Sequence, residues 1–312
     1  MPAAVLLAVL AGVAQALSLA WPGSGAPLWW LQILSLAVFA WLLAQARSRL
    51  KAGLLGWVAR TARLASTFSW LSLSRPGLRA LAAPLAVLAV LGLAAFLGAY
   101  YAIVSWCFWP LAQANKALAA MVFAALWLLA ELARGQWWTG LPWGAGGYAH
   151  ADGPLAALAP WVGVYGMGCV AALLAMLLAR RAWVALAAVA MLLAGVGLVR
   201  PASTPAGTLS VALLQGNIPQ DEKFQPGTGV PTALAWYASE LRSAQAQLVV
   251  APETAIPLLP QQLDPAYLDG LRARYTQPGG GQAALVGIPL GDEKEGYTNS
   301  AWGLDAATAA RA

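Results

Sequence analysis

Charged side chains are scarce in this chain of 312 residues: Asp, Glu, Lys and Arg make up only 10% of it, whereas 60% of the residues are hydrophobic. The mean hydropathy of +0.66 is too high for a soluble domain of this length, so membrane-spanning segments are expected. Histidine occurs once, as His150. Because no cluster of His, Cys and carboxylate residues has the spacing of metal ligands, we predict neither a metal nor another cofactor.

Cysteine is almost as rare, and both cysteines lie in apolar segments, Cys107 in SWCFW and Cys169 in GMGCVAA. Free cysteines in such surroundings usually behave as inert, small hydrophobic side chains. We therefore expect neither to be a nucleophile, and we expect no disulfide between them. His150, in GYAHADG, is expected to end a loop at the membrane interface rather than to take part in catalysis.

The charges are divided unevenly along the chain. Residues 1–202 contain 12 Lys and Arg and two Asp and Glu, whereas residues 203–312 contain six and ten. The pI of about 9.6 therefore reflects basic loops of the first part. No basic stripe with exposed aromatic residues is present, so nucleic acid is not an expected partner. We predict a transmembrane helical domain over 1–202 and a separate extracytoplasmic domain over 203–312.

The first part contains seven apolar runs, each about as long as a helix that crosses a bilayer. The first run has no basic segment before it and no cleavage site after it, so we expect a retained helix. The third run is the weakest, because Arg60 and Arg63 give it the pattern of an amphipathic helix at the membrane interface. The runs lie near residues 3–20, 28–46, 52–72, 81–106, 114–133, 155–179 and 182–199.

Basic residues in the short loops predict the orientation of these helices. The loops that follow the second, fourth and sixth runs are basic, which favours a cytoplasmic N-terminus and an extracytoplasmic position for everything after Arg200. An even number of spans would reverse this. Arg75, Arg79 and Arg134 fall on the other side and oppose the assignment. The supporting residues are Arg47, Arg49, Lys51, Lys116, Arg180 and Arg181.

An acidic residue near the end of the fifth run is unusual for a membrane segment. Glu131 and Arg134 are three residues apart on a helix and can form an ion pair. A carboxylate at this depth is costly and usually has a partner and a purpose. The pair either closes the helix structurally or serves a function. The Gly-, Pro- and Trp-rich loop that follows, with Pro142, Trp143 and Tyr148, either anchors the interface or shapes a site open to lipid.

The second part has the pattern of a layered α/β sheet, because strand-like and helix-like segments alternate. In such sheets, chemistry gathers where the strands end. Glu253 follows the strand LVV and lies between Pro252 and Pro257, which suits a fixed general base. An ordinary polar turn is the alternative. Expected strands cover 208–217, 246–253, 283–291 and 296–305, and expected helices cover 233–245 and 263–276.

Longer motifs carry a resemblance to a known family. The order LLQGNIPQDEKF, LVVAPETAIP, ALVGIPLG and YTNSAWGLD, together with ExxRGxxxTGxPWxxxGY in the first part, resembles bacterial apolipoprotein N-acyltransferase. This resemblance covers essentially the whole chain. It implies a polytopic α-helical membrane bundle followed by part of an α/β nitrilase-like (carbon–nitrogen hydrolase) domain. It also implies a multi-pass protein of the bacterial inner membrane, with the nitrilase-like part on the periplasmic side.

The same resemblance implies an activity. The family moves an acyl chain from a membrane phospholipid to the N-terminal amino group of an apolipoprotein with a diacylglyceryl cysteine, through a thioester on a cysteine. Glu253 matches the family's general base. Pro142, Trp143 and Tyr148 match its membrane-loop motif and would contact lipid or lipoprotein. The membrane helices would admit acyl chains from the bilayer.

The chain departs from the family pattern after this point. The family's lysine follows the strand that matches YTNSAWGLD, and its cysteine comes later still, whereas this sequence ends at Ala312. Neither Lys223 nor Lys294 occupies the place of that lysine. We therefore expect these residues to be the N-terminal part of an acyltransferase, inactive by themselves.

Three alternatives stay open. A membrane-tethered amidase or nitrilase would use the same catalytic groups with water as the acceptor, although a tether needs only one helix. A transporter could carry Glu131 and Arg134 in its pathway, but no inverted repeat of broken helices supports this. The chain could also be a degenerate remnant that has no function.

Overall fold

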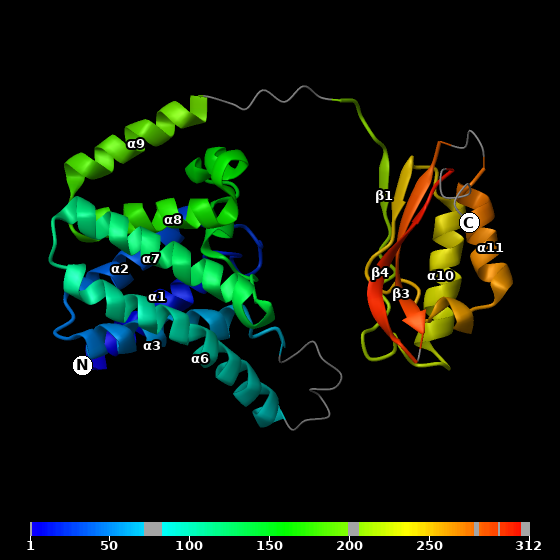
Figure 1. Cartoon of the computed structure of the whole chain (residues 1–312), viewed down its shortest axis with the longest axis horizontal. Helices are drawn as coiled ribbons and strands as arrows, with labels where there is room; N and C mark the ends of the chain where they lie inside the picture. Colours follow the sequence, from blue (N-terminus) through cyan, green and yellow to red (C-terminus); the bar gives the residue numbers. More distant parts are fainter. Residues whose placement is uncertain (1, 72–82, 199–205, 278–280, 293, 307–312) are drawn as a thin grey trace. The chain divides into compact units, whose positions relative to one another are not determined.

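The computed structural model describes residues 2–71, 83–198, 206–277, 281–292 and 294–306. They form two compact units, Met1–Ala202 and Ser203–Ala312, shown in Figure 1. The first unit is helical and the second contains a small sheet covered by helices. Arg75 and Arg79, which oppose the predicted orientation, lie outside the described residues.

The first unit is built from helices joined by short loops and 3₁₀ turns. Apolar residues dominate every helix except α3, which contains three arginines and one lysine. The 3₁₀ turns are η1 (Trp109–Leu111), η2 (Trp137–Thr139), η3 (Gly146–His150) and η4 (Pro154–Leu158). The helices are α1 (Pro2–Leu17), α2 (Trp29–Ala44), α3 (Arg49–Thr67), α6 (Ala83–Phe108), α7 (Lys116–Gln136), α8 (Ala159–Ala179) and α9 (Trp183–Leu198).

Within the described residues, three helical segments are long and apolar enough to cross a membrane: Pro84–Leu111, Lys116–Gln136 and Pro154–Ala179. Helices α1, α2 and α9 are apolar but shorter. The first unit is thus mostly helical with three membrane-capable helices. The crossing of all seven runs stays a prediction.

Helix α3 lies between α1 and α6 and packs closely against both. Small residues make this possible, because Ala52, Gly56 and Ala59 are buried. A Cβ atom on Gly56 would overlap the hydroxyl of Ser105 and lie 2.7 Å from the Tyr101 carbonyl oxygen. The backbones of α3 and α6 therefore approach at a distance that only glycine permits.

The interfacial assignment of the arginines on α3 is wrong. Arg60 and Arg63 are 0% and 1% exposed, and both lie inside the unit. The apolar side chains Leu50, Leu54 and Trp57 instead occupy the exposed face of the helix. The amphipathic pattern was real, but its polar face points inward, because another helix supplies a buried charge of opposite sign.

The second unit contains a mixed sheet of four strands in the order β1-β2-β3-β4 among the described residues. The first three strands are parallel, and β4 is antiparallel to β3. The alternation of strands and helices agrees with the sequence, although β1 and β2 are only three residues long. The elements are β1 (Val211–Leu213), α10 (Gly229–Ser243), β2 (Leu248–Val250), η5 (Pro260–Gln262), α11 (Pro265–Tyr275), β3 (Ala283–Asp292) and β4 (Gly296–Leu304).

A tight turn makes β4 antiparallel. The carboxylate of Asp292 accepts hydrogen bonds from the backbone N–H groups of Lys294 and Glu295, both at 2.7 Å. These bonds close the hairpin tip and lower the pKa of Asp292. The side chain of Asp292 therefore stabilises the turn that leads into β4.

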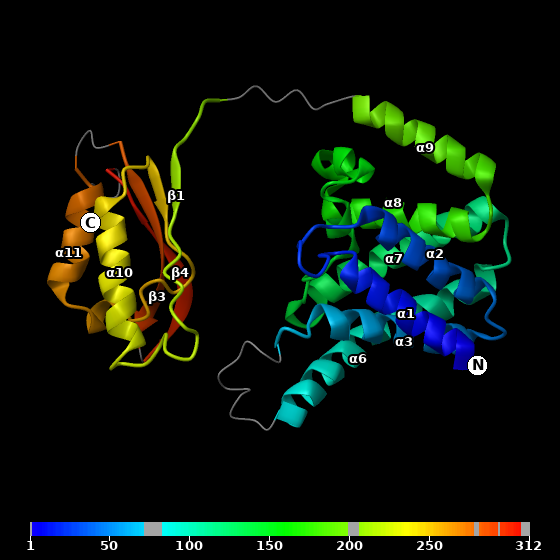
Figure 2. The ribbon, with the colours of Figure 1, turned by 180° about the vertical axis from the view of Figure 1, so that it is seen from behind.

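Helices α10 and α11 cover the same face of the sheet (Figures 1 and 2). Both crossovers step in one direction along the sheet, and right-handed connections then place both helices on one side. The core between the layers includes Leu241, Val249 and Val286, all fully buried. On the sheet, the apolar side chains of Val211, Leu213 and Leu285 remain exposed.

Substitution of Gly56 tests the close approach of α3 and α6. Gly56→Ala should destabilise the protein by about 1–3 kcal/mol, because the new methyl group collides with the neighbouring helix. Gly92→Ala on α6 is the matched control, since nothing lies within 4 Å of a Cβ atom there. It should be neutral or stabilising by about 0.5–1 kcal/mol. Thermal unfolding in detergent, followed by circular dichroism, measures both; equal midpoints would contradict this packing.

Candidate functional site

Glu253 lies in a turn directly after strand β2. Two backbone hydrogen bonds fix this turn against β3: Ala251 N–H donates to the Leu285 carbonyl at 2.9 Å, and Ile256 N–H donates to the Gly287 carbonyl at 3.1 Å. Thr254 has a φ of 51°, which turns the chain sharply between the two bonds. Ile256 is buried and Glu253 is exposed, so the turn is held by its apolar side while its carboxylate faces outward.

Glycine at position 287 allows the close contact between β3 and this turn. A Cβ atom there would overlap the Pro252 carbonyl oxygen and lie 2.7 Å from Glu253 Cα. Any larger residue would push the turn away from the sheet. Gly287, in the middle of β3, and Glu253, after β2, are thus in contact although 34 residues separate them in the sequence.

Two side chains distant in sequence hold Glu253. Asn299 Nδ2, on β4, donates to Glu253 Oε1 at 2.6 Å. Lys223 Nζ donates to the backbone carbonyl of Glu253 at 3.0 Å. Burial lowers the pKa of Lys223, and the nearby Glu253 carboxylate only partly opposes this. Sequence reasoning assigned no role to either partner, because their approach depends on strand pairing and on the path of the 214–228 loop.

A cleft of about 430 Å³ adjoins this turn. Its walls mix apolar and polar side chains, and it includes Asn299, the partner of Glu253. Residues that are remote in sequence meet there because the second half of β3, the first half of β4 and the loop after β1 all border the cleft. The lining residues are Phe224, Thr254, Pro257, Leu259, Gln262, Pro289, Tyr297 and Asn299.

Polar residues shortly after β1 form a local arrangement of their own. Gln215 Nε2 donates to Asn217 Oδ1 at 3.0 Å, and Gly216 N–H donates to the Tyr237 hydroxyl at 3.2 Å. Asn217 has a φ of 48°, so the chain turns out of the sheet here. This turn explains why β1 ends at Leu213, four residues before the predicted end.

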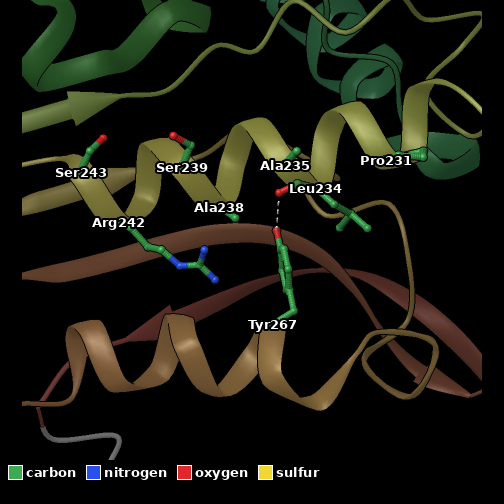
Figure 3. Close-up of a pocket in the computed structure, with 8 residues that line it drawn as sticks. All are labelled: Pro231, Leu234, Ala235, Ala238, Ser239, Arg242, Ser243 and Tyr267. Carbon is green, nitrogen blue, oxygen red and sulfur yellow. Dashed lines mark hydrogen bonds between the residues drawn. The ribbon is translucent and has the colours of Figure 1, made fainter.

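A second groove of about 770 Å³ lies between α10 and α11 (Figure 3). Tyr267 spans it, and its hydroxyl donates to the Leu234 carbonyl oxygen at 3.1 Å. Burial raises the pKa of Tyr267 to about 12, so this hydroxyl remains a donor. Arg242 also lines the groove, but no carboxylate does. Without an acid–base pair, this groove is a weaker candidate for catalysis than the Glu253 turn.

In the first unit, the structure brings Glu131 and Arg134 together inside a larger buried charge cluster. Arg134 Nη2 lies 2.9 Å from Glu131 Oε2, and Arg60 Nη2 lies 3.1 Å from Glu131 Oε1. Arg63 Nη1 is more distant, at 3.9 Å. The hydroxyl of Tyr101 donates to Glu131 Oε1 at 2.7 Å. We call these five residues the Glu131 cluster.

The Glu131 cluster contains three guanidinium groups and one carboxylate, so its positive charges need further partners. Arg60 Nη1 donates to Gln15 Oε1 at 2.5 Å, and its guanidinium carbon lies 4.1 Å and 4.3 Å from the ring centroids of Tyr101 and Trp127. Such cation–π contacts stabilise a desolvated cation. Aromatic faces and a side-chain amide thus offset part of the excess charge.

The remaining arginine donors hold the loop after α7. Arg134 Nη1 donates to the carbonyl of Leu141 and, at 3.0 Å, to that of Trp143. Arg63 Nη2 donates to the carbonyl of Gly144. The cluster therefore fixes the backbone of the predicted membrane loop. Arg134 is buried and is not a loop charge, so it no longer opposes the predicted orientation.

The three loop residues predicted to contact lipid or lipoprotein have exposed side chains. Trp143 and Tyr148 are 53% and 55% exposed, and Pro142 is exposed too. The ring centroids of Trp143 and Trp70 are 5.7 Å apart. The loop thus has a rigid backbone and outward aromatic rings. Glu131 and Glu253 lie in different units.

His150 was expected to end a loop at the membrane interface, and the position of this loop relative to a membrane stays a prediction. His150 does end η3, but it is 0% exposed, and its Nε2 lies 3.3 Å from Gln32 Oε1. Burial lowers the pKa of His150 to about 4, so the ring is neutral near pH 7.

Both cysteines are free and lie in helices of the first unit. Cys107 is exposed on α6, and Cys169 is half-buried on α8 with its Sγ atom 3.5 Å from the Ala124 carbonyl. Neither has a base beside it among the described residues. The described parts of the chain also contain no group of three His, Cys, Asp or Glu that could hold a metal.

Comparison with known proteins identifies relatives over nearly the whole chain. A family model described as the apolipoprotein N-acyltransferase N-terminal domain matches residues 11–177. A protein of Verminephrobacter eiseniae named apolipoprotein N-acyltransferase is 57% identical over 97% of this chain and 60% of its own length. Proteins of the same name from Ralstonia nicotianae and Bordetella bronchiseptica are 42% and 34% identical, each over 96% of this chain and over 58% and 62% of their own lengths. The chain thus spans about three fifths of these curated relatives.

Removal of the buried carboxylate tests the Glu131 cluster. Glu131→Gln should destabilise the first unit by about 3–5 kcal/mol, because three buried arginines lose their counter-charge. Asp152→Asn is the matched control, since Asp152 is the other acidic residue of 1–202 and is exposed. It should leave stability within about 0.5 kcal/mol. Thermal unfolding in detergent reports both, and a Glu131→Gln midpoint equal to that of the control would refute a role in holding the unit together.

Acid should destabilise the protein through His150. The pKa of this residue is about 4 when folded and near 6.5 when unfolded, so the unfolded chain binds more protons between these values. The contribution of neutral His150 to the free energy of unfolding is complete above pH 6.5. It falls by up to about 3 kcal/mol as the pH decreases toward 4. His150→Gln should flatten this part of the stability profile, measured by denaturant unfolding at several pH values. Identical slopes for the two proteins would exclude His150 as the source.

Proposed function

This chain belongs to the apolipoprotein N-acyltransferase family, and from that premise we propose that it takes part in acyl transfer from a phospholipid to the N-terminal amino group of an apolipoprotein with a diacylglyceryl cysteine. The observation that carries the proposal is the Glu253 turn, where an exposed carboxylate is held in one orientation beside a cleft.

Glu253 is proposed as the general base. Asn299 occupies Oε1, and no hydrogen bond to Oε2 is present among the described residues, so this oxygen is available to accept a proton. Lys223 holds the backbone of the same residue. A base gains efficiency when its position is fixed before the substrate binds.

The proposed reaction has two steps. Glu253 takes the proton of a cysteine thiol, and the thiolate attacks the ester carbonyl of the phospholipid. The departing lysophospholipid oxygen takes this proton from Glu253, and a thioester remains. The amino group of the apolipoprotein then attacks the thioester, gives one proton to Glu253 and releases the cysteine thiolate, which takes that proton back. We propose that neither Cys107 nor Cys169 is this nucleophile, because both lie in the helical unit and not in the unit of Glu253. We therefore do not expect residues 1–312 to complete the transfer by themselves.

The membrane arrangement is part of the proposal. All seven apolar runs would cross the inner membrane, and the nitrilase-like unit at 203–312 would lie on the periplasmic side. Basic residues lie at the loops that follow α2, α6 and α8, which supports a cytoplasmic position for those loops. These residues are Arg47, Lys51, Lys116 and Arg180. The exposed rings of Trp143 and Tyr148, on a backbone held by buried arginines, would contact lipid or lipoprotein.

The product distinguishes this reaction from that of a membrane-tethered amidase or nitrilase. An acyltransferase delivers the acyl chain to an amine, whereas a hydrolase delivers it to water. Mass spectrometry of a diacylglyceryl lipopeptide incubated with phospholipid separates the two outcomes. A gain of one acyl chain on the peptide supports the transferase, and release of free fatty acid alone supports the hydrolase.

Substitution of Glu253 tests the assigned base. In the enzyme produced from its native gene, Glu253→Gln should lower the rate of lipopeptide acylation by about 100- to 10,000-fold, because the amide cannot accept the thiol proton. Glu295→Gln, at the exposed hairpin tip, is the matched control and should keep the original rate. Circular dichroism checks that both variants are folded. A folded Glu253→Gln enzyme with unchanged rate would remove Glu253 from the mechanism.

A further inference from the structure

A groove of about 670 Å³ lies in the first unit, far along the chain from Glu253. It is formed by the start of α1, the end of α2 and the first half of α3. Figures 1 and 2 show the start of α1, marked N, beside the loop that joins α2 to α3. The lining residues are Ala3, Ala4, Val5, Leu7, Trp41, Leu42, Gln45, Ala46, Arg47, Lys51, Leu54, Leu55, Trp57 and Val58.

Most of this groove is apolar. Leu7, Trp41, Leu54 and Trp57 contribute large side chains that remain 39–45% exposed. These side chains come from three different helices and converge on one space. Such a surface is unfavourable in water but suits the hydrocarbon tail of a lipid.

One end of the groove is basic. Arg47 and Lys51 both line it, and both have exposed side chains. Within the described residues, no ion pair involves either cation. Arg49 differs, because its guanidinium lies 5.0 Å from the ring centroid of Trp106. Two cations that form no ion pair with the described residues therefore line one end of an apolar groove.

The first unit has no spare carboxylate for these cations. Its sequence contains only two acidic residues, Glu131 and Asp152. Glu131 is buried among Arg60, Arg63 and Arg134. The N-terminal end of α7 adjoins the end of α2 that borders the groove, because Gln113 Nε2 donates to the Ala44 carbonyl at 3.0 Å. Asp152 comes after the C-terminal end of α7, which is the opposite end of that helix. The charge that complements this groove must come from outside the unit.

We propose that this groove binds a phospholipid with an anionic headgroup. The headgroup phosphate would contact Arg47 and Lys51, and one acyl chain would lie along Leu7, Leu54 and Trp57. Each basic residue near a membrane surface favours anionic over zwitterionic lipid by about fivefold in affinity. The site is separate from the Glu253 turn and needs only that these helices lie in a bilayer, so it stands or falls independently of the acyl transfer.

Native mass spectrometry of the whole chain in detergent tests this site. Phosphatidylglycerol and phosphatidylcholine of the same acyl chains are titrated in parallel, and the first bound lipid is counted. Phosphatidylglycerol should bind at least about tenfold more tightly. The double variant Arg47→Ala/Lys51→Ala should lose this preference. Arg47→Lys/Lys51→Arg should retain it, because the charges remain.

Lys116→Ala is the matched control, since Lys116 is a basic residue outside the groove lining. It should leave the lipid preference unchanged. The proposal is overturned if the wild-type chain binds both lipids equally, or if Lys116→Ala and the double alanine variant weaken binding to the same extent. Displacement of the lipid by soluble glycerol 3-phosphate at similar concentration would also overturn it, because the apolar groove would then contribute nothing.

Discussion

The first unit depends on one buried carboxylate. Glu131 is 2% exposed and lies among three guanidinium groups that belong to α3 and α7. Isolated charges at such depth are strongly unfavourable, so the arginines can be buried only while the carboxylate is present, and the carboxylate only while they are. This mutual requirement fixes how α3 rotates between α1 and α6. It also explains why Arg60 and Arg63 point inward, while Leu54 and Trp57 on the same helix remain exposed.

The charge excess of the Glu131 cluster links this interior to the loop after α7. One carboxylate satisfies only some of the donors on three arginines, and the others bind the carbonyls of Leu141, Trp143 and Gly144. A loop rich in glycine and proline would otherwise lose considerable conformational entropy on ordering. Its backbone is held from inside, so aromatic side chains such as Trp143 and Tyr148 can remain at the surface in fixed positions.

The second unit positions its candidate base by a different physical device. There the backbone holds the turn of Glu253 in place. The 251–256 turn forms hydrogen bonds to β3, and the absence of a side chain at Gly287 allows the close contact. Asn299 and Lys223 then orient Glu253 from two further segments. The carboxylate stays exposed, in contrast to Glu131. Glu131 thus holds a unit together from inside, whereas the carboxylate of Glu253 lies at the surface.

Sequence by itself determined the class of each part, because hydrophobic run length and strand–helix alternation are local properties. It identified the family and the strand that ends beside Glu253. It also showed that Glu131 and Arg134 are three residues apart on a helix, a spacing that allows an ion pair. It could not determine which way the charged face of α3 points, because an amphipathic pattern has the same period whether its polar side meets water or a buried partner. Nor could it bring Asn299 and Lys223 to Glu253, or Arg63 to the loop after α7. Those contacts join residues 30 to 81 positions apart, and only the packing of helices and the pairing of strands decides them.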